Sequence, residues 1–135
     1  MARHYHVDIA RFAVGADSKW IDNLLSHFEI PGVERARQGL SRRISELGVY
    51  HIALIHALNR DAGFSTRSAV AIATRLLSDN QTTVPIDREL RLSLDRDVFV
   101  RRIDAAIAEA VESVALPRRG RPPRTDRSPD DPAAR

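Results

Sequence analysis

The side chains best suited to recognise another molecule lie on one face of a segment near the N-terminus. Between residues 17 and 28, apolar side chains recur at helical spacing, which leaves a polar face opposite them. The amide of Asn23 could pair with adenine, and the ammonium group of Lys19 could bind guanine or a phosphate. The other polar candidates on this face are Ser18, Ser26 and His27. The chemistry available here is hydrogen bonding to the edges of nucleic-acid bases.

A second group of candidates follows the pair Pro31-Gly32, which cannot continue a helix and favours a turn. Residues 33–44 predict two short strands joined by a loop, with Gly39 at the bend. This predicted hairpin carries the basic and amide side chains Arg35, Arg37, Gln38, Arg42 and Arg43. Guanidinium groups at the tip of a hairpin would contact phosphates or a minor groove, where they add salt-dependent affinity and little base choice. The alternative interpretation is a solvated amphipathic helix beside an ordinary basic loop.

The last 19 residues form a third candidate. Residues 117–135 are rich in proline and arginine and nearly free of apolar side chains, so they cannot repay the entropy of folding and are predicted to be a disordered tail. Within them Arg119-Gly120-Arg121 is followed by proline and resembles an AT-hook, in which an extended Arg-Gly-Arg lies in the narrow minor groove of A·T-rich DNA. A nonspecific basic linker explains the same run equally well.

Metal binding and catalysis find little support in the sequence. His4, His6 and Asp8 could point the same way along a strand, but no further cluster completes a closed coordination shell. His51 and His56 are five residues apart, which does not bring them together on a helix, so they are expected at the core or its boundary. The chain has no cysteine, no glycine-rich phosphate loop and no hydrolase motif. We therefore expect no enzyme activity, no catalytic residue, no metal and no cofactor.

Mainly helical elements are expected to position these candidates. Apolar periodicity, capping residues and breakers predict helices over residues 7–14, 17–28, 45–60, 65–77 and 97–116. The expected helix boundaries are Gly15, Asp17 or Ser18, Ser45, Ser65, Asp95 or Asp97, and Pro117. Residues 78–85 are polar and turn-rich, and the alternation of Leu90, Leu92 and Leu94 with polar residues predicts one half-buried strand.

Charge and hydropathy limit the setting in which the chain works. The net charge is +3, and basic residues exceed acidic ones in the N-terminal third and in the tail, but not in the middle of the chain. A polyanion would meet those two regions. No apolar run is long enough to span a bilayer, and the N-terminus lacks the features of a secretory signal. We expect a soluble cytoplasmic protein without a membrane partner.

From residue 7 to about residue 78, the order of elements resembles the DNA-binding domain of the MerR family, the mercury-resistance regulators. The residues that carry the resemblance are Phe12-Ala13-Val14-Gly15-Ala16, Trp20, Leu24, Arg42-Arg43-Ile44-Ser45 and Gly63-Phe64-Ser65. The resemblance implies a dimeric transcription regulator with its recognition helix on residues 17–28 and wing arginines on the DNA backbone. Two features depart from the family. Asn23-Leu24-Leu25-Ser26 stands where an Arg-Tyr-Tyr/Trp-Glu run is usual, and a linker, a strand and a helix replace the long dimerisation helix.

Taken together, the sequence predicts a mainly α protein: a winged helix-turn-helix with a small β-hairpin wing, a helical pair, a C-terminal helix and a disordered tail. The expected divisions are a DNA-binding domain at residues 1–78, a strand and helix at 79–116 as a candidate dimerisation element, and the tail at 117–135. The expected function is transcription regulation by a homodimer on double-stranded DNA. A protein-interaction module, such as an antitoxin or adaptor, is the alternative. RNA binding ranks last, because aromatic residues make up only 5% of the chain and lie mostly on apolar faces.

Overall fold

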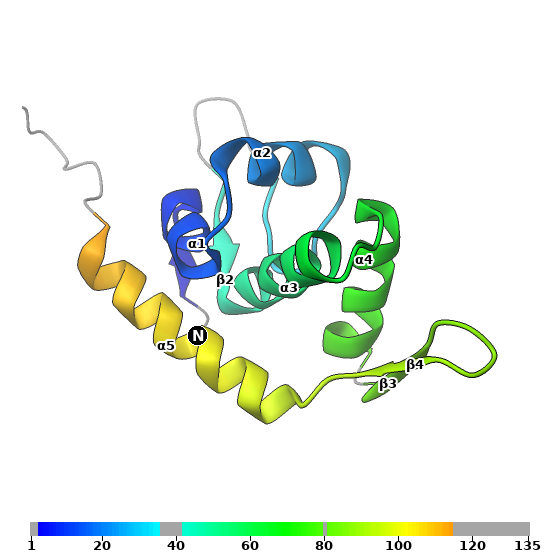
Figure 1. The fold of residues 1–135 in the computed structure, drawn as a ribbon. Helices are drawn as coiled ribbons and strands as arrows, with labels where there is room; N and C mark the ends of the chain where they lie inside the picture. Colours follow the sequence, from blue (N-terminus) through cyan, green and yellow to red (C-terminus); the bar gives the residue numbers. More distant parts are fainter. Residues whose placement is uncertain (1–2, 36–41, 80, 115–135) are drawn as a thin grey trace, which may run out of the picture.

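The computed structural model describes residues 3–35, 42–79 and 81–114 of the 135-residue chain. They form a mainly helical fold with two small antiparallel pairs of strands (Figure 1). The elements in chain order are β1 (His4–Tyr5), α1 (Val7–Val14), α2 (Ser18–His27), β2 (Ile44–Ser45), α3 (Glu46–His56), η1 (Ala57–Asp61), α4 (Thr66–Ala73), η2 (Thr74–Ser78), β3 (Thr83–Pro85), β4 (Arg91–Ser93) and α5 (Arg96–Ser113). Among the described residues, no helix is long and apolar enough to cross a bilayer.

The first two helices begin and end close to the predicted residues. His6 caps α1, because its ring atom Nδ1 accepts a hydrogen bond of 3.1 Å from the amide of Asp8. Gly15 ends α1 with a left-handed φ of +75°, a conformation that glycine adopts without a Cβ penalty. Asp17 occupies the N-cap position of α2, but its side chain makes no capping hydrogen bond. The glycine between the two helices lets the chain turn sharply from α1 into α2.

The predicted hairpin over residues 33–44 is only partly confirmed. Val33 pairs with Ile44 in an isolated antiparallel bridge, and the amide of Glu34 donates to the carbonyl of Arg43 at 2.9 Å. The strand β2, however, pairs along its other edge with β1, which places Tyr5 opposite Ile44. Both of these side chains are buried, so the core explains the pairing that the sequence analysis did not predict. The loop tip with Arg37, Gln38 and Gly39 lies outside the described residues.

The helical pair has the predicted caps. The hydroxyls of Ser45 and Ser65 accept hydrogen bonds from backbone amides in the first turns of α3 and α4. Each helix then widens into one π-helical turn, η1 after α3 and η2 after α4, and Gly63 makes the turn between the pair with φ +81°. The capped starts confirm both helices, with π-helical ends that the 3.6-residue period did not show.

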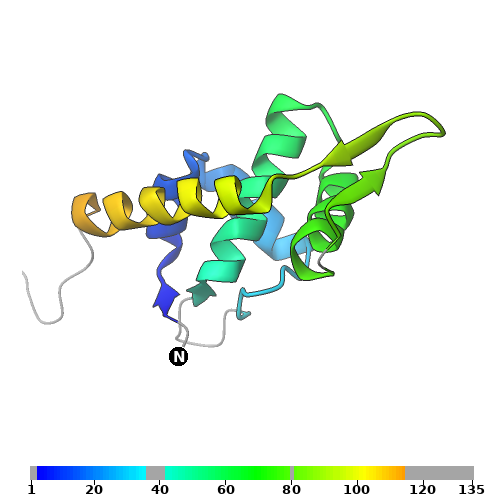
Figure 2. The ribbon, with the colours of Figure 1, turned by 90° about the horizontal axis from the view of Figure 1, so that it is seen from below.

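The C-terminal part of the fold differs from the prediction in one element. The predicted strand around Leu92 is β4, but it pairs with β3, which lies in the segment interpreted as turn-rich. Asp95 then caps α5, as one of the two predicted cap residues. Helix α5 packs against α1 and α3 (Figures 1 and 2), and it buries Phe99, Ile103, Ile107 and Ala110. Its apolar face therefore belongs to the core of its own chain.

Candidate nucleic-acid interface

Helix α2 presents the predicted polar residues on one solvent-exposed face. Its buried side chains are Ile21, Leu24 and Leu25, which pack into the core. The opposite face is exposed along the whole helix and consists of Ser18, Lys19, Asp22, Asn23, Ser26 and His27. The structure thus brings together all five side chains proposed for this helix. The same face also carries the carboxylate of Asp22, which was not among the proposed residues. In Figure 1, α2 lies at the top of the molecule with α3 beneath it.

A half-buried polar contact fixes α2 on the helical pair. The indole Nε1 of Trp20 donates a 3.1 Å hydrogen bond to Oδ1 of Asn59, whose amide nitrogen donates at 2.8 Å to the carbonyl of Phe64. The rings of Trp20 and His56 also form a T-shaped pair, with 4.7 Å between centroids and 87° between planes. A helix held by such contacts presents its outer face in one orientation, which recognition by hydrogen bonding requires. The sequence analysis missed Asn59, because a lone asparagine late in a helix gives no local signal.

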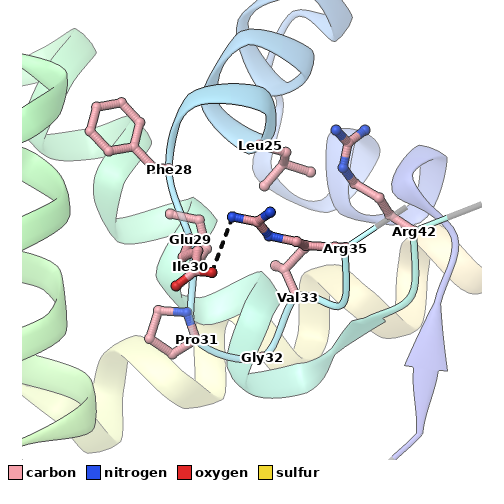
Figure 3. Close-up of a pocket in the computed structure, with 9 residues that line it drawn as sticks. All are labelled: Leu25, Phe28, Glu29, Ile30, Pro31, Gly32, Val33, Arg35 and Arg42. Carbon is pink, nitrogen blue, oxygen red and sulfur yellow. Dashed lines mark ion pairs between the residues drawn. The ribbon is translucent and has the colours of Figure 1, made fainter. Parts of the chain in front are cut away.

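The C-terminal end of α2 borders an open pocket that contains two of the predicted arginines. Figure 3 shows this pocket, which has a volume of about 440 Å³. Its lining residues are Leu25, Phe28, Glu29, Ile30, Pro31, Gly32, Val33, Arg35 and Arg42. An adjoining hollow is lined by Ser26 and His27 together with Arg35 and Arg42. Polar side chains of α2 and arginines of the 33–44 segment therefore face one continuous concave surface.

The carboxylate of Glu29 neutralises part of the positive charge of this surface. The guanidinium Nη2 of Arg35 lies 3.1 Å from Oε2 of Glu29, and both side chains are about 80% exposed (Figure 3). An ion pair this exposed contributes little to stability, so Arg35 can exchange its partner for another anion at small cost. No ion pair of Arg42 is found among the described residues.

Arg43 lies elsewhere, at the small sheet made by β1 and β2. Its Nη2 is 3.1 Å from Nδ1 of His4, and Nε2 of His4 is 3.4 Å from a carboxylate oxygen of Glu34. Arg43 is thus placed apart from the pocket that contains Arg35 and Arg42. His6 caps α1, and the described part of the chain contains no group of three side chains that could hold a metal ion.

The remaining two histidines lie in the core and at its boundary. His51 is completely buried, with Nε2 3.0 Å from the hydroxyl oxygen of Ser78, and burial lowers its pKa to about 4. Burial and, less strongly, the positive charge of Arg60 lower the pKa of His56. Both positions fit the predicted core or boundary role. The predicted tail residues Arg119, Gly120 and Arg121 lie outside the described residues.

Comparison with known protein families, with curated proteins and with solved structures found no match.

Proposed function

We propose that this chain is a DNA-binding transcription regulator in which α1 and α2 form a helix-turn-helix and residues 33–44 form its wing. Helix α2 would enter the major groove of double-stranded DNA, and the wing would contact the adjacent backbone. The observation that carries the proposal is the shared concave surface at the end of α2. There the polar end of an exposed, rigidly held helix lies beside Arg35 and Arg42.

The division of labour follows from the chemistry of the side chains. Asn23 and Lys19 lie exposed on α2 and can form paired hydrogen bonds with base edges. Arg35 and Arg42 can bind phosphate oxygens, with the phosphate replacing Glu29 as the partner of Arg35. The proposal includes the resemblance to the MerR family and the homodimer that it implies. The basic tail would add electrostatic affinity that depends on salt.

Binding of the full-length chain to random-sequence duplex DNA across a salt series tests the wing. Replacing Arg35 and Arg42 by alanine should weaken binding about tenfold or more at low salt and lower the slope of log affinity against log salt by about 2. The matched control replaces Arg101 and Arg102 by alanine. These two arginines are exposed on α5, on a different side of the molecule from α2 (Figure 1), and the change removes the same charge. The control loses only the affinity that comes from the lower net charge, so it should bind DNA nearly as tightly as the wild type.

A variant of opposite sign makes the test sharper. Glu29→Gln removes the carboxylate that pairs with Arg35, so it should tighten DNA binding several-fold at low salt, with the gain shrinking as salt screens the charges.

Asn23→Ala should leave binding to random DNA nearly unchanged and weaken binding to a selected site by about 1–3 kcal/mol. Equal losses in the wing variant and the α5 control would refute the wing, and would move the search to protein partners.

A further inference from the structure

The β3–β4 hairpin projects from the helical body (Figures 1 and 2). Two of its large apolar side chains, Ile86 and Leu90, are exposed to solvent. Residues 85–91 are exposed without interruption, and Leu90 at 61% is the most exposed of the large apolar side chains in the described part of the chain. The tip is nevertheless a defined turn. The amide of Ile86 donates to the carbonyl of Leu90 at 2.8 Å, and the amide of Arg88 donates to the carboxylate of Asp87 at 2.7 Å. An ordered turn therefore holds Leu90 in water, where it gains nothing from burial.

A pocket suited to an apolar side chain lies between α4 and the same hairpin. It has a volume of about 230 Å³, room for a leucine side chain. Its lining residues are Phe64, Ser68, Ala71, Ile72, Arg75, Val84, Pro85 and Ile86. Most of these side chains are apolar, and the guanidinium Nε of Arg75 donates to Gln81 at 2.9 Å. The hairpin thus supplies both an exposed apolar side chain and one wall of an apolar pocket.

The charges of the tip indicate which partner fits. Asp87 and Glu89 are acidic, Arg88 and Arg91 are basic, and none of the four forms an ion pair within the described residues. A tip with no excess positive charge offers little to a polyanion. Because the tip carries two acidic and two basic side chains, a second copy related by a twofold axis can pair the acidic side chains of one hairpin with the arginines of the other.

We propose that the β3–β4 hairpin is a contact between two copies of this chain, in which Leu90 of each copy occupies the α4 pocket of the other. The contact buries Leu90 and pairs the four unpaired charges of each tip. Helix α2 and the hairpin lie on different sides of the molecule in Figure 1, so the polar face of α2 stays accessible in such a dimer. The inference does not depend on DNA binding, because it uses neither α2 nor the 33–44 segment.

Sedimentation equilibrium of the full-length chain without DNA tests the contact. Wild type should be dimeric, and Leu90→Asp should raise the dimer dissociation constant about tenfold or more, because a carboxylate would enter an apolar pocket. The control is Val111→Asp, which places the same charge at an exposed valine of α5 and should leave the constant unchanged. Both positions are exposed, and unchanged circular dichroism melting of each variant checks that it folds.

Charge reversal identifies the partner as a second copy. Glu89→Arg and Arg91→Glu should each weaken the dimer, and the double variant should restore it to within about threefold of wild type. The proposal is overturned if wild type is monomeric at concentrations on the order of 100 µM, if Leu90→Asp dimerises like wild type, or if Val111→Asp weakens the dimer equally. It is also overturned if the chain is a monomer and Leu90→Asp abolishes its binding to DNA, because the hairpin would then be a DNA contact. A dimer that binds no DNA would contradict only the proposed function.

Discussion

At the scale of single residues, His51 makes the stability of this fold sensitive to acid. Its side chain is fully buried, and desolvation lowers its pKa from the ordinary 6.5 to about 4. His51 is therefore protonated near pH 6.5 in the unfolded chain, but only near pH 4 in the folded chain. The free energy of unfolding should be at its full value above pH 6.5 and should fall as the pH drops toward 4, by on the order of 3 kcal/mol. Urea unfolding at a series of pH values measures this loss.

The matched variants for this prediction are His51→Gln and His27→Gln. Glutamine replaces the ring that contacts the Ser78 hydroxyl by a polar amide that does not titrate, so the stability of His51→Gln should vary less between pH 6.5 and 4. His56 shifts in the same direction and will retain a part of the dependence. His27→Gln serves as the control, because it removes an exposed histidine by the same substitution. The same slope in wild type and in His51→Gln would rule His51 out as its source.

The sequence predicted part of the candidate site at this scale and missed the rest. The spacing of Ile21, Leu24 and Leu25 predicts which face of α2 is buried, so the exposed positions of Asn23 and Lys19 follow from periodicity alone. The contact between Trp20 and Asn59 joins residues 39 positions apart, and no local pattern encodes it. The pairing of Arg35 with Glu29, and the separation of Arg43 from Arg42, likewise depend on the path of the chain through residues 29–44.

At the scale of elements, the turn at Gly32 positions the segment that carries Arg35 and Arg42. Gly32 has φ +87°, and a Cβ built there would lie 2.3 Å from the backbone nitrogen of Gly48 and 2.7 Å from the Ser45 hydroxyl oxygen. Gly32→Ala must therefore pay both for the left-handed backbone and for displacing the start of α3. We expect it to lower the free energy of unfolding by about 3 kcal/mol. Thermal or chemical denaturation measures the change.

Gly15 provides the control for this turn, since it also has a positive φ but no atom within 4 Å of the added Cβ. Gly15→Ala should cost only the backbone term, about 1–2 kcal/mol. Equal losses in the two variants would show that the close approach of Gly32 to α3 does not matter. A larger loss in Gly32→Ala, accompanied by weaker DNA binding, would show that the turn positions the proposed wing.

Helices were predictable from this sequence in a way that the strands were not. Serine caps and apolar periodicity over eight or more residues specify α3 and α4 locally. The alternation of Leu90, Leu92 and Leu94 predicted β4, but β1 and β2 contain two residues each and β3 only three, too few for a period of two to appear. Their pairing comes instead from the burial of Tyr5, Ile44 and Val84 against the helices. Tertiary contacts therefore determine whether such short strands form and with which strand they pair.

At the scale of the whole molecule, α5 packs across the domain boundary that was predicted after residue 78. It lies after this boundary and contacts helices that lie before it. Its buried side chains enter the same hydrophobic core as those of α1, α2 and α3. The hydroxyl of Tyr50 on α3 donates to the carboxylate of Asp104, and burial and this hydrogen bond raise the pKa of Tyr50. At the start of α5, the guanidinium of Arg96 donates to the last carbonyls of η2, at Leu76 and Leu77. These contacts favour a single cooperative unit over two independent ones.

Ile103→Ala tests that unit, because Ile103 is 1% exposed at the centre of α5 while Trp20 reports from the distant α2. The truncation should lower the free energy of unfolding by about 2–5 kcal/mol. If the fold is one unit, the fluorescence of Trp20 and the circular dichroism of all helices should shift to the same lower urea midpoint. Val111→Ala, at an exposed position of the same helix, should shift neither by more than about 0.5 kcal/mol. A Trp20 transition that stays at its wild-type midpoint while the helical signal moves would mean that α5 unfolds separately, and that the part of the fold around α2 is stable without it.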